Sequence, residues 1–183
     1  MRGFTLLELL IVVVVLGILA GLAFPVLAKS VTDARLRGAV SEVATALRYA
    51  KASAMNTGRR CRVVFDVAGE TLEVSQVVHE NIDELKDTNE SELDEWDVDD
   101  VNLWIWVEMD NPVHPGVPYE IDFGAAEAFG GVDIVSATFG TGTTVEFDAR
   151  GTASEDGIVV IGFGGRQASI QVDDESGRIS VIQ

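Results

Sequence analysis

The feature that most constrains this chain is a long apolar run close to its N-terminus. Residues Leu9 to Ala28 carry no charged side chain. A helix of this length spans about 30 Å, which matches the hydrocarbon core of a lipid bilayer. The run contains Gly17, Gly21 and Pro25, which membrane helices tolerate better than soluble helices do. The sequence therefore predicts a transmembrane span over residues 9–28.

A cleaved secretory signal peptide is the alternative interpretation of this run. Its apolar core would be shorter, about 7–15 residues, and a small-x-small cleavage site would follow it. Ala20-Gly21-Leu22-Ala23 fits such a site loosely. However, the basic region before the run is only Arg2, and the acidic Glu8 lies at its edge. These features favour the membrane span.

Glu8 is an isolated acid at the start of the predicted span. A carboxylate at this depth is costly to bury and usually has a partner. In one interpretation it lies at the level of the lipid headgroups, where the dipole at a helix N-terminus favours an acid. In the other, it pairs with a positive charge.

The residues around Glu8 favour the second interpretation. Gly3-Phe4-Thr5-Leu6-Leu7-Glu8 resembles the class III leader junction of type IV pilins and type II secretion pseudopilins. The resemblance implies that residues 1–3 form a short leader, that a prepilin peptidase cuts between Gly3 and Phe4, and that Phe4 becomes N-methylated. It also implies that Pro25 kinks the helix.

The same resemblance assigns a role in assembly to Glu8. Cleavage frees an ammonium group at Phe4, close to the depth of the Glu8 carboxylate. Pairing the ammonium of one subunit with the carboxylate of a neighbour would offset the desolvation of both charges. The family implies that this pairing sets the register of a subunit joining the filament. Pairing of Glu8 with its own N-terminus is the alternative that the residues leave open.

Helical periodicity continues beyond the apolar run. Apolar residues follow a 4-3-4-3-4 spacing, which places them in one stripe: Leu36, Val40, Val43, Leu47, Ala50 and Ala54. Gly58 indicates the C-terminal end. We therefore predict one helix over residues 4–57, amphipathic from 29 to 57. Residues 29–62 carry eight bases and two acids, which form either a solvated face or a surface complementary to acidic neighbours.

After Gly58 the apolar pattern changes to a period of two, which is typical of strands. The predicted strands are 61–67, 71–77, 103–107, 143–147, 158–162, 167–172 and 178–182. Gly162 to Arg166 is glycine-rich but lies between two strands, so it predicts a hairpin turn rather than a phosphate-binding loop. The expected fold is α+β, with a long N-terminal helix packed on an antiparallel β-sheet or sandwich formed by a periplasmic domain, residues 58–183.

The C-terminal strands carry a second resemblance. Val145 to Gly151, Gly157 to Val160 and Ser176-Gly177-Arg178-Ile179 look like the corresponding strands of H-type pseudopilins and of FimT/FimU-type minor pilins. This resemblance implies a minor pseudopilin of a type II secretion system, assembled near the filament tip. The implied partners are other pilin-like subunits, the prepilin peptidase and the inner-membrane assembly platform. The implied location is the bacterial inner membrane, crossed once, and then a periplasmic filament.

Two alternative functions remain at this point. The first is a minor type IV pilin that primes pili for motility, adhesion or DNA uptake. The second is a membrane-anchored periplasmic binding module with no role in a filament. Residues 63–183 carry 27 acids and four bases, and this charge would repel nucleic acid and anionic membrane surfaces. The composition therefore disfavours nucleic acid as a partner.

The acidic residues concentrate in residues 80–100, which hold eleven acids and one base. We interpret this segment as a solvated insertion between strands. A calcium site formed by Asp94, Asp97, Asp99 and Asp100 is the alternative, but the segment lacks the spacing and glycine of an EF-hand. A docking surface for a basic partner is a third possibility.

The sequence contains no motif that predicts an enzyme. It lacks a P-loop, G-x-S-x-G and H-E-x-x-H, and we expect no cofactor or metal. Cys61 is the only cysteine, so no intramolecular disulfide forms, and we predict that it is a buried structural residue. His114 lies in a proline-rich loop and is expected to be structural or exposed rather than catalytic.

Overall fold

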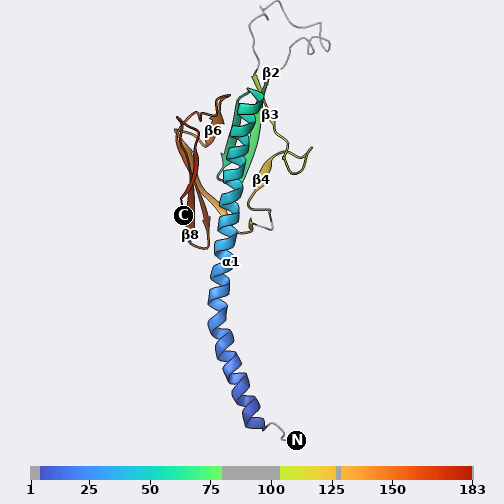
Figure 1. The fold of residues 1–183 in the computed structure, drawn as a ribbon, viewed down its shortest axis with the longest axis vertical. Helices are drawn as coiled ribbons and strands as arrows, with labels where there is room; N and C mark the ends of the chain where they lie inside the picture. The colour runs from blue at the N-terminus through green and yellow to red at the C-terminus, as the bar shows by residue number, and fades with distance from the viewer. Residues whose placement is uncertain (1–4, 80–103, 127–128, 183) are drawn as a thin grey trace, which may run out of the picture.

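The structure is a computed structural model, and it describes residues 5–79, 104–126 and 129–182. Within these ranges, the side chains of residues 20–30, 79 and 104 are left undescribed. One long helix, α1, runs along the whole molecule, and its N-terminal part extends beyond a β-rich domain that packs around its C-terminal part (Figure 1). The chain therefore divides into a protruding helix and a globular head.

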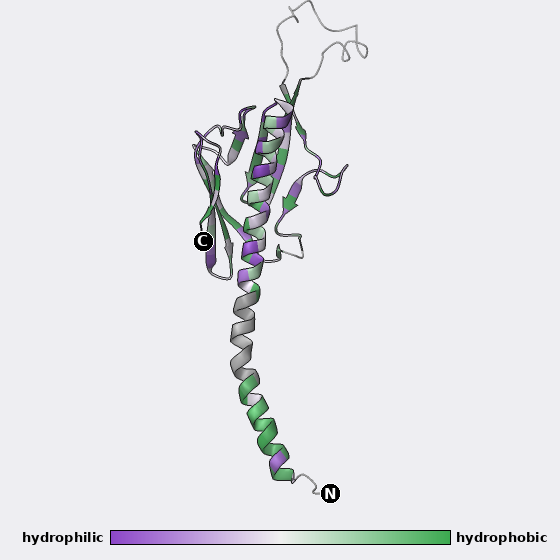
Figure 2. Cartoon of the chain, viewed as in Figure 1, coloured by the Kyte–Doolittle hydropathy of each residue, from purple (hydrophilic) through white to green (hydrophobic). Residues whose placement is uncertain are grey.

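Helix α1 comprises Leu6–Thr57. It begins at a capping box, in which Thr5 is the N-cap and Glu8 the third helical residue. It ends where Gly58 adopts a left-handed backbone with φ of 69° and donates its N–H to the carbonyl of Ala54. Figure 2 shows that the start of the helix is hydrophobic apart from one hydrophilic position. Among the residues that the structure describes, no helical stretch meets the length and hydropathy needed to cross a membrane.

The described strands form two antiparallel sheets. Sheet 1 has the order β3-β2-β1-β6, and β4 pairs with the remainder of the β2 edge that β3 leaves free. Its strands are β1 (Cys61–Asp66), β2 (Thr71–His79), β3 (Trp104–Glu108), β4 (Glu120–Asp122) and β6 (Thr144–Phe147). Sheet 2 has the order β5-β7-β8-β9. Its strands are β5 (Asp133–Phe139), β7 (Gly157–Phe163), β8 (Arg166–Val172) and β9 (Ile179–Ile182).

The core lies between the two sheets and α1. All six residues of the apolar stripe from Leu36 to Ala54 are buried, and α1 contacts strands of both sheets. Phe65 and Phe139 stack with ring centroids 5.8 Å apart, which joins sheet 1 to sheet 2. Full burial of such a side chain stabilises the fold by about 1.5–3 kcal/mol. The helix therefore belongs to the core of the head.

The predicted α+β fold, with a long N-terminal helix packed on antiparallel sheets, is confirmed. Each of the seven predicted strands is present, and no end differs from the prediction by more than two residues. The predicted hairpin turn is also present, because Phe163 pairs with Arg166 across Gly164 and Gly165, which both have positive φ. We did not predict β4 and β5. β4 has only three residues, and a bulge between Ile134 and Ser136 interrupts the alternation of β5.

Candidate assembly site

The N-terminal end of α1 holds the carboxylate of Glu8 against its own helix. The backbone N–H and the hydroxyl of Thr5 donate to Oε2 of Glu8 at 3.0 and 3.1 Å, and the N–H of Glu8 donates to the Thr5 hydroxyl at 3.3 Å. Sequence reasoning singled out Glu8 but missed Thr5, although the T-x-x-E spacing is the signature of a capping box. Gly3 and Phe4 lie outside the described residues, and Pro25 lies inside α1.

The apolar side chains that follow Glu8 are not covered by the head. Those described between Leu6 and Leu19 are at least 48% exposed. A contiguous apolar surface of this kind marks an interaction with protein or lipid. In the protruding part of α1, the charged side chain of Glu8 therefore lies at the start of an exposed apolar surface.

A second junction ties α1 to the C-terminal turn. Nζ of Lys51 donates to the carbonyl oxygens of Ser176 and Gly177 at 2.9 and 3.0 Å. Gly177 has φ of +56°, and a side chain there would overlap the carbonyl of Gly151. The two C-terminal motifs therefore meet beside the helix. Gly151 requires glycine for a different reason, because its φ is +82° and a Cβ atom there would overlap Met55 and Lys51 of α1.

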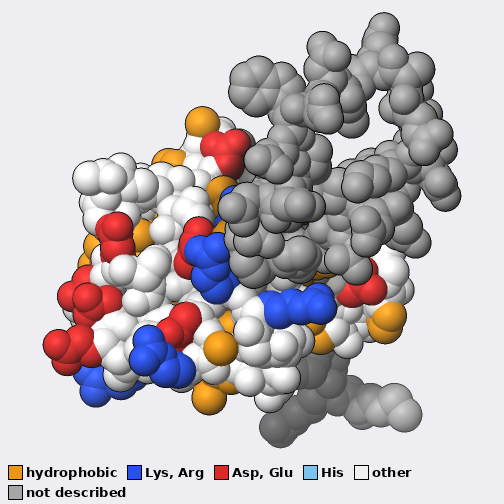
Figure 3. Space-filling view, turned by 90° about the horizontal axis from the view of Figure 1, so that it is seen from above, with side chains coloured by type: hydrophobic (Ala, Val, Ile, Leu, Met, Phe, Trp, Pro, Cys, Tyr) orange, Lys and Arg blue, Asp and Glu red, His pale blue; other side chains and the backbone are white. Residues whose placement is uncertain are grey.

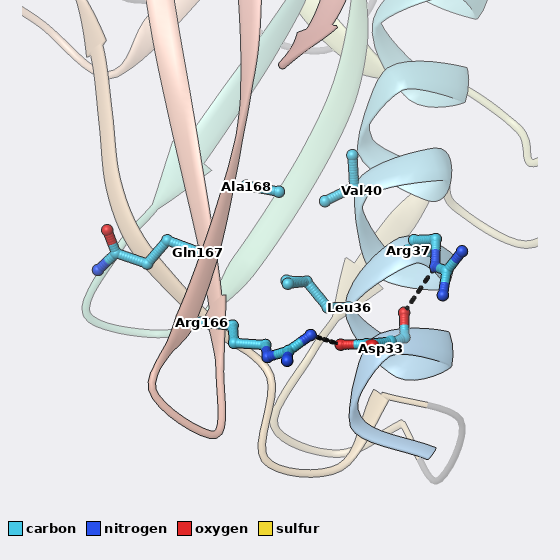
Figure 4. Close-up of a pocket in the computed structure, with 7 residues that line it drawn as sticks. All are labelled: Asp33, Leu36, Arg37, Val40, Arg166, Gln167 and Ala168. Carbon is cyan, nitrogen blue, oxygen red and sulfur yellow. Dashed lines mark hydrogen bonds and ion pairs between the residues drawn. The ribbon is translucent and has the colours of Figure 1, made fainter. Parts of the chain in front are cut away.

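A groove opens where α1 leaves the head. Its volume is about 460 Å³, and it lies between α1 and β8. Leu36, Val40 and Ala168 form its apolar floor, and an ion pair between Arg166 and Asp33 bridges the helix to the hairpin (Figure 4). Arg35 reaches the carbonyl of Gly130 at 3.0 Å and lies over the Phe163 ring. These cations attach the helix to the loops at the base of the head.

The basic residues that follow α1 also contact their own domain. Arg60 pairs with Glu146 at 3.2 Å, and Nε of Arg62 donates to the hydroxyl of Ser75 at 3.0 Å. Both guanidinium groups lie over the Trp106 ring, at 5.9 and 4.3 Å from its centroid. From the sequence we expected the basic residues of 29–62 to form either a solvated face or a surface for acidic neighbours. In the structure, several of these cations bind groups of the head itself.

Several titratable groups have a shifted pKa with a clear structural cause. Burial raises the pKa of the Cys61 thiol, and Cys61 is fully buried as predicted. Burial, with Glu42 and Tyr49 nearby, raises the pKa of Tyr119 to about 12. Hydrogen bonds from Thr152 and then from Arg150 hold the pKa of Asp148 below its ordinary range.

The predicted calcium candidates Asp94, Asp97, Asp99 and Asp100 lie outside the described residues. Within the described part of the chain, no group of three or more His, Cys, Asp or Glu side chains is arranged to hold a metal ion. His114 is exposed.

Comparison with known protein families agrees with this architecture. Residues 39–177 match the family model described as type II transport protein GspH, which covers most of the chain. This chain belongs to the GspH family. Residues 1–24 match a second model, the prokaryotic N-terminal methylation motif. No curated protein sequence matches the chain significantly.

Solved structures of the minor pseudopilin EpsH share the fold of this GspH-family chain. One structure of the minor pseudopilin EpsH from the type 2 secretion system of Vibrio cholerae has a TM-score of 0.52 at 12% identity, with 81% of this chain and 96% of that chain covered. A second EpsH structure has a TM-score of 0.51 at 14% identity, covering 83% and 95%. The type IV minor pilin FimU of Pseudomonas aeruginosa has a TM-score of 0.48 at 15% identity, covering 81% and 88%.

Proposed function

We propose that this protein is a structural filament subunit, a minor pseudopilin of a type II protein secretion system, assembled near the tip of the pseudopilus. The observation that carries the proposal is the match of residues 39–177 to the GspH family. The fold supports it, since a helix with an exposed apolar start carries a β-rich head. A minor type IV pilin, the alternative, is favoured by no comparable family match. The family consists of pilin-like structural subunits rather than enzymes.

The proposal assigns a role to each part of the chain. Residues 1–3 are the leader, and a prepilin peptidase cuts between Gly3 and Phe4 and methylates Phe4, in agreement with the methylation motif over residues 1–24. Residues 4–57 form the assembly helix, which is anchored in the bacterial inner membrane through residues 9–28 and kinked at Pro25. Residues 58–183 form the periplasmic head, which includes the acidic insertion 80–100. The assembly platform in the inner membrane and other pilin-like subunits are the partners.

Glu8 then has two tasks that can be separated. It completes the capping box with Thr5, and its charge is available to the N-terminal ammonium of a neighbouring subunit. A glutamine can replace glutamate in a capping box, but it carries no charge. We expect Glu8→Gln and Glu8→Ala to insert normally and to be incorporated into filaments equally poorly, as measured by shearing and immunoblotting. Normal incorporation of Glu8→Gln together with poor incorporation of Glu8→Ala would show that the cap is needed and the charge is not.

The experiment that tests the proposed function is a clean deletion, assayed side by side for secreted proteins and for surface pili. We expect secretion to be lost while pili remain, and complementation with the wild-type chain should restore secretion. Complementation with Gly3→Ala should fail, and intact mass should show that this variant keeps residues 1–3. Loss of pili with normal secretion would instead assign the chain to the minor pilins. Normal secretion and normal pili would favour the membrane-anchored binding module.

A further inference from the structure

The edges of the two sheets differ in how they are protected from pairing with another strand. An exposed edge is a template for an added strand, and proteins usually block it with charge, a bulge, short length or a covering loop. On β6, Glu146 exchanges hydrogen bonds with Ser154, whose N–H donates to the Glu146 carbonyl at 2.8 Å. The edge strand β5 carries a bulge. β4 is three residues long with exposed acids, and the four-residue β9 contacts α1.

Among the described residues, the outer edge of β3 carries only one of these protections, the exposed charge of Glu108. β3 has five residues, WIWVE, without lysine, proline or a bulge. The N–H of Val77 donates to the carbonyl of Arg60, which directly precedes β1, and the N–H of Val74 donates on the opposite side to the carbonyl of Tyr119. Because backbone groups alternate along an antiparallel ladder, Ile105 and Val107 bond to β2. The N–H and C=O groups of Trp106 and Glu108 therefore point to the outer edge.

The side chains beside this edge are suited to protein contact. Trp106 is half-buried and lies under the guanidinium groups of Arg60 and Arg62, which fix its ring. Arginine and tryptophan are the residues most enriched where binding energy concentrates. On the opposite face of β3, the side chain of Val107 is 47% exposed. Glu108, also exposed, is the only charged residue of the strand.

We propose that the outer edge of β3 binds an extended segment of a neighbouring pilin-like subunit, which adds to sheet 1 as a strand. This inference rests on the proposed function. The bound segment would have apolar residues beside Trp106 and Val107 and a basic residue opposite Glu108, because opposite charges stabilise directly facing cross-strand pairs. Main-chain hydrogen bonds would supply the attachment, and these side chains would supply the selectivity.

The size of this edge argues for a filament neighbour as its occupant. A stable independent interface involves about 20–30 residues on each side, whereas β3 offers five. An edge of this size binds appreciably only when other contacts hold the partner close, as in the high effective concentration of linked binding modules. Subunits whose long helices pack side by side meet that condition, and a freely diffusing protein does not.

The test places a photo-cross-linking amino acid at residue 107 of the full-length chain, in cells with an active prepilin peptidase. Val135 on the bulged edge of β5 is the matched control position, since it is 45% exposed. We expect residue 107, and not residue 135, to cross-link to a processed pilin-like subunit, with the adduct mapping to an extended segment that contains a basic residue. Cross-linking only to residues 80–103 of the same chain, equal yields at both positions, or no adduct would overturn the inference.

Two further variants test the pairing itself, with the cross-linker kept at residue 107. Glu108→Gln removes the charge, whereas Glu108→Pro removes the charge and the outward N–H without removing a bond to β2. We expect the first to lower the yield about twofold to tenfold, and the second to abolish it. Equal yields for both variants would overturn strand addition.

The same samples separate this inference from the proposed function. Intact mass reports whether residues 1–3 are removed and Phe4 is methylated. A processed chain without the expected adduct would overturn the inference alone. An unprocessed chain would overturn the proposed function and this inference with it.

Discussion

At the scale of single residues, the close approach of Gly177 to the carbonyl of Gly151 explains the glycine of the second C-terminal motif. Gly177 needs glycine for two independent reasons. Its φ of +56° lies in the region that disfavours residues with a side chain, and a Cβ atom would overlap the carbonyl oxygen of Gly151. Lys51 binds the carbonyl of Gly177 from the helix. Gly177 therefore lies where α1 meets the two turns that precede β7 and β9.

The hairpin between β7 and β8 offers a control for these two reasons. Gly165 has φ of +78° but nothing lies within 4 Å of a Cβ atom built there. We expect Gly165→Ala to lower the free energy of unfolding by about 1–2 kcal/mol, the cost of a left-handed backbone. Gly177→Ala should cost more, because steric overlap adds to that term. Denaturant unfolding of the detergent-solubilised chain measures the free energy of unfolding of both variants. Equal losses would mean that overlap with the Gly151 carbonyl adds no cost at residue 177.

At the scale of elements, α1 serves the head and the filament with different parts of its length. From Leu36 onward its apolar stripe is buried against both sheets, whereas the apolar side chains described between Leu6 and Leu19 are exposed. A single substitution in the buried part of α1 should therefore lower the stability of the head.

Leu47 tests this division, because it is fully buried in the core. We expect Leu47→Ala to lower the free energy of unfolding by about 2–5 kcal/mol, through lost burial and the cavity that remains. Arg48, next to it, is exposed, and Arg48→Ala should change stability by no more than about 0.5 kcal/mol. Circular dichroism in denaturant measures both values. A loss below about 1 kcal/mol for Leu47→Ala would mean that the helix is not part of the core.

At the scale of the whole molecule, charge repulsion outweighs ion pairing. The net charge is -17, and such an excess destabilises a compact state. Figure 3 shows several acidic side chains along one side of the head, with basic side chains both beside them and nearer the middle of this face. The ion pairs among the described residues are Arg60–Glu146, Arg150–Asp148 and Arg166–Asp33, and all are partly exposed. Exposed pairs contribute about 0–1 kcal/mol each.

Salt should therefore stabilise this protein. Raising sodium chloride from about 0.01 M to about 0.15 M shortens the Debye length from about 30 Å to about 8 Å, which screens the distant repulsions. We expect Tm to rise over this range, measured by tryptophan fluorescence in a non-ionic detergent. Choline chloride at the same ionic strength is the control for specific binding of sodium. A fall in Tm would mean that the ion pairs contribute more than the repulsion.

Local patterns in the sequence predicted most of the elements. The 3.6-residue period of the apolar stripe predicted α1, and the two-residue period predicted seven strands, because both periods follow from backbone geometry alone. The pattern failed where that geometry is irregular, at the bulge of β5 and at the three-residue β4. The junction Gly3-Phe4 and Glu8 were recognisable because their chemistry lies in one short segment, although their roles in processing and assembly remain proposals.

Contacts between residues that are distant in the sequence could not be predicted from local patterns. The sequence shows that Lys51, Arg60 and Arg62 are basic, but their partners lie 126, 86 and 13 residues further along the chain. The position of β3 at an edge likewise depends on which strands pair with β2, and the exposure of Val107 depends on what packs against its face of the sheet. Periodicity is a local property of the backbone, whereas strand order, buried contacts and free edges arise only when the elements pack together.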